Sequence, residues 1–105
     1  MTLTINIKYK GKDSKKFAQE MINTGLVDRI RAQKGNNRYE YYQSFDRDDE
    51  ILLIDEWQDQ DALNNHHKSK MMAEIIKLRE KYDITLEVRK FEEIKGSDDS
   101  EYIRK

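Results

Sequence analysis

The residues best suited to chemistry lie near the middle of the sequence. His66 carries an imidazole whose ordinary pKa, about 6.5, suits proton transfer near neutral pH. Trp57 offers a ring that could form the wall of an aromatic pocket and an N–H that could hold a ligand oxygen. Asp55 shares a strand face with Trp57 by period two and could orient His66 or a ligand hydroxyl. The amide of Asn6 suits a ligand oxygen as well.

Each of these residues has a plainer interpretation. His66 could be a hydrogen-bonded helix histidine, and Trp57 a large core residue where the sheet meets the helices. Asp55 could be a solvated edge carboxylate. Asn6 lies between two isoleucines, so its amide is either satisfied in a polar pocket or faces a dimer interface. His67 is rotated about 100° around the helix from His66, which predicts a solvent-facing side chain.

Composition excludes several kinds of site and partner. The chain has 105 residues, which is enough for one domain, and its net charge of -1 argues against nucleic-acid binding and against a polybasic membrane clamp. Cysteine is absent and there are two histidines, so we expect no metal site. No apolar run approaches the length of a membrane span, and the first residues do not resemble a signal peptide. We therefore expect a soluble cytoplasmic protein without a cofactor.

Apolar periodicity predicts the elements that must position these residues. Alternating residues predict a strand from Leu3 to Tyr9, and helical spacing predicts a helix that begins at Asp13 or Ser14 and is interrupted at Gly25. Further strands are predicted over 38–45, 50–57 and 82–94, the last with a bulge at Phe91, and a helix in two pieces is predicted over 59–81. Residues 96–105 read as a polar tail, which leaves one domain over 1–95.

The order strand, helix, strand, strand, helix, strand predicts an α+β fold. Its arrangement is the ferredoxin-like βαββαβ topology, an antiparallel four-stranded sheet with the helices on one face. The first strand and residues 51–54 offer apolar side chains to both faces of that sheet. A homodimer that packs sheet against sheet would cover the second face.

One stretch carries a family resemblance. Gly35-Asn36 leads to Tyr39, and the run ILLIDEW over 51–57 is followed by Asp61-Ala62-Leu63 and by His66, nine residues after the tryptophan. This pattern resembles the antibiotic biosynthesis monooxygenase family, which includes quinol monooxygenases. The resemblance covers about residues 1–95.

The resemblance implies a dimeric α/β barrel with a pocket between sheet and helices in each subunit. It implies oxidation of a quinol-like or polyphenolic aromatic molecule by O2 without a metal or flavin. His66 would be the general base that removes a phenolic proton, and the substrate would then supply the electrons for O2. Trp57, Tyr39, Asn6 and Asp55 would bind the substrate. The expected partners are thus a small aromatic molecule, O2 and a second copy of the chain.

Three positions depart from the family pattern. Met71 stands where family members commonly carry a second histidine, and Leu53 and Leu63 stand where some members use polar residues. These apolar replacements favour a second hypothesis, a small-molecule-binding or sensing dimer that does no chemistry. An isomerase that acts on a small phosphorylated signalling metabolite is a third hypothesis, because the fold hosts one.

Overall fold

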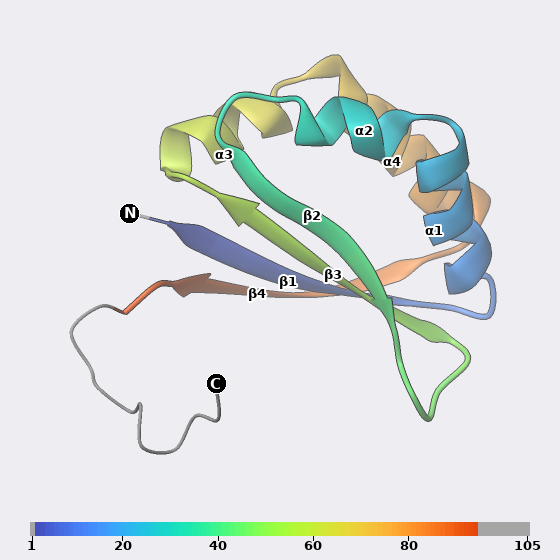
Figure 1. Ribbon diagram of the computed structural model, residues 1–105. Coiled ribbons are helices and arrows are strands. Elements are labelled where there is room, and N and C mark those ends of the chain that lie inside the picture. The colour runs from blue at the N-terminus through green and yellow to red at the C-terminus, as the bar shows by residue number, and fades with distance from the viewer. Residues whose placement is uncertain (1, 95–105) are drawn as a thin grey trace.

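A computed structural model describes residues 2–94 of the chain (Figure 1). The polar tail expected over 96–105 lies outside the described residues. The elements in chain order are β1 (Leu3–Lys10), α1 (Ser14–Asn23), α2 (Leu26–Arg31), β2 (Asn36–Gln43), β3 (Glu50–Trp57), α3 (Gln60–His67), α4 (Lys70–Lys81) and β4 (Thr85–Glu92). None of the helices in this part of the chain is long and apolar enough to cross a membrane.

The four strands form one antiparallel sheet in the order β2-β3-β1-β4. The helices all lie over the same face of this sheet, and no other element of residues 2–94 covers the opposite face (Figure 1). This is the ferredoxin-like βαββαβ fold, and it confirms the α+β prediction. Each of the two predicted helical segments consists of two helices, α1 with α2 and α3 with α4.

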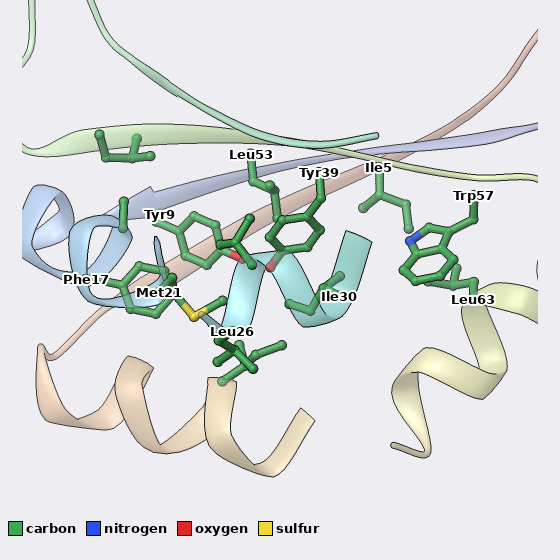
Figure 2. Packing of buried hydrophobic residues seen from close by; sticks show 14 of the residues in the cluster. Ile5, Tyr9, Phe17, Met21, Leu26, Ile30, Tyr39, Leu53, Trp57 and Leu63 are labelled. Atoms are coloured by element: carbon green, nitrogen blue, oxygen red, sulfur yellow. The ribbon is translucent and has the colours of Figure 1, made fainter. Parts of the chain in front are cut away.

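Alternation along the strands decides which residues form the core. In β3 each odd-numbered residue is buried and each even-numbered residue is half-buried, because successive side chains point to opposite faces of the sheet. The odd-numbered side chains of β1 and β3 therefore face the helices and pack with residues of α1 and α2 (Figure 2). The core on this face includes Tyr9, Phe17, Ile30, Leu53 and Trp57.

Three strand predictions were wrong in detail. The last strand, predicted over 82–94, runs from Thr85 to Glu92, because α4 continues to Lys81 and Tyr82 is its C-cap. The second strand begins at Asn36 rather than Arg38 and ends at Gln43, and its irregularity lies between Asn36 and Arg38. No bulge occurs at Phe91, because the pairing of β1 with β4 is continuous and places Phe91 opposite Thr4. Phe91 breaks the apolar alternation of its strand because it faces the uncovered side of the sheet.

Local signals explain where the helices begin and break. The Asp59 Oδ1 atom accepts a hydrogen bond of 2.8 Å from the backbone N–H of Ala62, so Asp59 is the N-cap of α3. Gly25 separates α1 from α2 with a φ of 79°, a left-handed conformation that glycine adopts without strain. These breaks bend each helical segment around the sheet.

Candidate active site

A cavity of about 330 Å³ lies between the sheet and the helices α3 and α4. Its apolar wall is made of side chains from β1, β4 and the two helices, namely Ile5, Ile7, Leu63, Met72, Leu86 and Val88. Its polar groups are Asp55, Gln60, His67, Arg79 and Lys90. Because β4 is an edge strand, Leu86 and Val88 remain partly exposed at this end of the cavity.

Asp55 is the buried acid of this cavity. Its side chain is 4% exposed, and Oδ1 has no hydrogen-bond partner among the described residues. Burial raises the pKa of Asp55 from 3.8 to about 7, because a charged carboxylate loses its hydration there. The nearby Trp57 lowers this pKa by less than burial raises it. At neutral pH this carboxyl group is therefore close to half ionised.

Arg79 brings a positive charge to the same cavity. It reaches inward from α4, and its buried Nε has no hydrogen-bond partner among residues 2–94. Its guanidinium carbon lies 5.8 Å from the ring centroid of Tyr9. Burial raises the pKa of Tyr9, while the charge of Arg79 lowers it by less. Arg79 thus offers a guanidinium group as a hydrogen-bond donor at the cavity wall.

Tyrosines of the sheet form a polar cluster beside Asp55. Tyr39 lies directly opposite Asp55 in the pairing of β2 with β3, and its hydroxyl oxygen is 3.5 Å from that of Tyr41. Figure 2 shows Tyr39 and Tyr9 pointing from the sheet toward the helices. Burial raises the pKa of Tyr39 well above 10.0, so its hydroxyl stays protonated. Tyr39 does not itself line the cavity.

His66 is buried against Trp57 rather than on the cavity wall. The two rings are stacked with centroids 4.9 Å apart, and His66 Nδ1 lies 2.7 Å from Gln33 Oε1. Since a carboxamide oxygen only accepts, Nδ1 carries the hydrogen. Burial lowers the pKa of His66 to about 4, with smaller effects from His67 and Arg79. A neutral imidazole with this pKa is a weak base at neutral pH.

The other histidine lines the cavity. His67 is exposed, as its place on the helix predicted, but its ring also reaches the mouth of the cavity, and its centroid lies 5.8 Å from that of His66. Burial, together with the positive charges of Lys90 and Arg79, lowers the pKa of His67. Of the two histidines, therefore, only His67 reaches the cavity.

The structure separates the predicted site residues. Trp57 is fully buried between the sheet and α3, beside Ile5 (Figure 2), and its N–H has no partner among the described residues. Asn6 faces the uncovered side of the sheet, where it lines a shallow pocket of about 170 Å³ with Leu52 and Phe91. Asn6 therefore cannot bind a substrate in the same cavity as Asp55.

Sequence reasoning did not identify Arg79 as a site residue. The spacing of residues along α4 nevertheless indicates that Arg79 faces the interior. Arg79 follows the buried Ile75 by four residues and the cavity residue Met72 by seven, so all three share one face of α4. A charged residue on a helix face that otherwise points into the protein must either be buried together with its charge or face a cavity.

Among the described residues no group of three or more histidine, aspartate or glutamate side chains is arranged to hold a metal ion. The cavity instead combines one carboxyl group, one guanidinium group and an apolar wall. Such a site can bind a flat molecule with an ionisable hydroxyl group and move a proton within it.

Solved structures share this fold. The chain is similar to SnoaB from Streptomyces nogalater, a cofactor-independent oxygenase, with a TM-score of 0.74 and 16% identity over 90% of this chain and 95% of that one. It is also similar to a candidate antibiotic biosynthesis monooxygenase from Deinococcus radiodurans (TM-score 0.73, 14% identity, 93% and 97% covered). A conserved protein from Methanosarcina mazei Go1 matches with a TM-score of 0.66 and 24% identity over 85% and 91% of the two chains.

At these identities the structural matches show the fold alone. No curated protein matches the sequence. The family model for antibiotic biosynthesis monooxygenases, however, matches residues 2–78, which is well over half of the chain and includes every predicted site residue. This chain therefore belongs to the antibiotic biosynthesis monooxygenase family.

Proposed function

We propose that this protein is a cofactor-independent monooxygenase that oxidises a quinol-like or polyphenolic molecule with O2 in the cavity between the sheet and α3 and α4. The observation that carries the proposal is that a buried carboxyl group, Asp55, and a half-buried arginine, Arg79, line the same cavity beside an apolar wall, in a chain of this family. The similarity to SnoaB, a cofactor-independent oxygenase, supports it.

The cavity fits an aromatic substrate of limited size. Its volume of about 330 Å³ lies at the lower end of the range for ligand pockets, which suits a small molecule of a few fused rings. Ile5, Leu63 and Met72 offer apolar contacts to the faces of such rings. Arg79, which lines the cavity, can hold a substrate oxygen and stabilise it as an anion, because the charge interaction is strong where water is excluded.

The proposed reaction balances without a further reductant. A quinol and O2 give a hydroxyquinone and water, so the substrate loses four electrons and O2 gains them. Loss of a hydroxyl proton leaves an electron-rich anion, which passes one electron to O2. The two radicals combine through a new C–O bond. The oxygenated carbon of the resulting peroxide then loses its hydrogen as a proton while the O–O bond breaks, which leaves a carbonyl group and releases water. The protein supplies binding, orientation and the proton transfers.

We also propose that the protein works as a homodimer that packs sheet against sheet. The helices leave one face of the sheet uncovered, and Leu52, Ile54 and Phe91 lie on that face. Charged groups such as Lys8 and Arg89 lie beside them. A second copy would bury these apolar side chains, which a monomer would leave in contact with water.

Oxygen uptake tests the proposed function. Metal-stripped protein is mixed with a panel of reduced naphthoquinones and anthrones, and O2 consumption is measured against the autoxidation rate of each compound. One O2 consumed per product, without return of O2 on addition of catalase, identifies a monooxygenase rather than an oxidase that releases peroxide. Arg79→Met should lower kcat/KM about 10²-fold, whereas the matched variant Lys77→Met, on the exposed face of α4, should not.

A binding protein without chemistry is the second candidate, and the predominantly apolar wall of the cavity favours it. In that case the same compounds would raise the thermal midpoint of unfolding and no oxygen would be consumed above the autoxidation rate. Uptake with the stated stoichiometry would exclude this candidate. No uptake by any compound in the panel would reject the monooxygenase proposal for quinol-like substrates.

A further inference from the structure

Asp55, the acid of the cavity, lacks the partners that usually stabilise a buried carboxylate. Asp55 is 4% exposed, forms no ion pair within residues 2–94, and leaves Oδ1 without a donor. An isolated buried charge is costly, and a buried carboxyl oxygen usually finds a partner. Asp55 instead lines the cavity.

The groups around Asp55 come from every element that packs against it. Ile5 of β1 and Tyr39 of β2 are its cross-strand neighbours. The charged or titratable groups that share the cavity are His67 of α3, Arg79 of α4 and Lys90 of β4. The hydroxyl groups of Tyr9 and Tyr41 lie farther along the sheet, and both remain protonated at neutral pH because burial raises their pKa values.

We propose that Asp55, rather than His66, is the general base that accepts the hydroxyl proton of the substrate. This inference rests on the proposed function, and it replaces the base that the sequence suggested. His66 Nδ1 is engaged with Gln33, its ring is stacked on Trp57, and it is absent from the cavity wall. Asp55 is the carboxyl group that the cavity exposes to a ligand.

The proton transfer can be written with named atoms. The substrate O–H bond breaks, its proton passes to the Asp55 carboxylate, and the electron pair stays on the substrate oxygen beside Arg79, which lines the same cavity. After the C–O bond has formed, Asp55 returns the proton to the peroxide oxygen that leaves as water. The carboxylate is thereby regenerated. Burial also makes Asp55 a stronger base than an ordinary aspartate, since its pKa of about 7 is closer to that of a phenol.

A neighbouring residue provides the matched control. Glu56 lies one position along β3 on the opposite face of the sheet, so Glu56→Gln makes the same chemical change away from the cavity. Asp55→Asn preserves the shape of the side chain and removes an unfavourable buried charge, so we expect it to fold. Folding is confirmed by circular dichroism and by the fluorescence of Trp57.

The experiment compares the pH dependence of oxygen uptake in wild-type protein, Asp55→Asn, Glu56→Gln and His66→Gln, with a reduced naphthoquinone as substrate. We expect Asp55→Asn to lower kcat by about 10²–10⁴-fold with a smaller change in KM. The wild-type kcat should rise as pH increases through about 7, because Asp55 must be ionised. This rise should be missing in Asp55→Asn and retained in the other two variants.

The outcomes separate the two proposals. If the wild-type protein consumes oxygen and Asp55→Asn retains both its rate and the rise near pH 7, Asp55 is not the base although the proposed function stands. If the rise disappears in His66→Gln alone, His66 is the base. If the wild-type protein does not consume oxygen at any pH, the proposed function fails and this inference fails with it.

Discussion

Replacing Asp55 by asparagine should change how the stability of the protein depends on pH. The folded protein keeps the Asp55 proton up to pH about 7, whereas the unfolded chain releases it near 3.8. Between these values the folded state binds more protons than the unfolded state, so the free energy of unfolding falls as pH rises. The stabilisation is complete below pH 3.8 and is lost above 7. At ~1.4 kcal/mol per pH unit the loss amounts to about 4 kcal/mol.

His66 has the opposite effect. Its pKa is lowered from 6.5 in the unfolded chain to about 4 in the folded protein, so the unfolded state binds more protons in that range. Its contribution is complete above pH 6.5 and is lost as pH falls through 4, by about 3 kcal/mol. Between pH 4 and 6.5 the contributions of Asp55 and His66 therefore nearly cancel in the wild-type protein. In Asp55→Asn the His66 contribution remains, and stability should rise across this range.

Urea unfolding at a fixed protein concentration measures this, with the fluorescence of the single tryptophan as the signal. Trp57 is fully buried, so its emission should change when the protein unfolds. Comparing the same two proteins at pH 4 and pH 8 cancels any constant effect of the asparagine amide. The difference in unfolding free energy between variant and wild type should grow by about 4 kcal/mol over that interval. A difference that stays constant, with Glu56→Gln as the reference, would refute the raised pKa of Asp55.

Three further changes test other parts of the structure. Gly35→Ala should destabilise the protein by about 2 kcal/mol or more, because φ is 87° there and an added Cβ would lie 2.5 Å from the Cβ of Ala62. Thermal unfolding measures this effect, and an unchanged midpoint of unfolding would contradict it. Gln33→Leu should cost about 1–3 kcal/mol by removing the acceptor of His66, and an unfolding curve identical to wild type would mean that this hydrogen bond contributes nothing. Ile54→Lys should convert the proposed dimer to a monomer in light scattering, and a dimer mass retained in this variant would place the interface elsewhere.

Most of the fold could be predicted from the sequence because its signals are local. Period-two alternation indicates a strand, helical spacing indicates a helix, and Gly25 and Asp59 mark a break and a cap with their own chemistry. Phe91 shows the limit of such signals. Phe91 departs from the apolar alternation of its strand, and this departure predicted a bulge. The strand is in fact regular there, and Phe91 is an apolar residue on the face of the sheet opposite the helices.

The site was harder to predict because it depends on which side of each element faces inward. Alternation places Asn6 and Ile5 on opposite faces of β1, but it does not say which face the helices cover. Adjacent histidines on one helix differ by about 100°, so the packing of α3 decides which of them reaches the cavity. Asp55 was assigned to the site, but its unpartnered oxygen depends on neighbours from several strands and helices.

The order of the strands has a consequence for synthesis on the ribosome. β1 is made before the other strands, yet it lies inside the sheet, and its partners β3 and β4 follow much later, with Leu3 paired to Glu92. A nascent chain that ends before β4 would expose one hydrogen-bonding edge of β1 and the apolar side of the cavity. Such long-range pairing slows folding and leaves an open strand edge available to other chains. We therefore expect shortened forms of this protein that lack β4 to depend on chaperones or to aggregate.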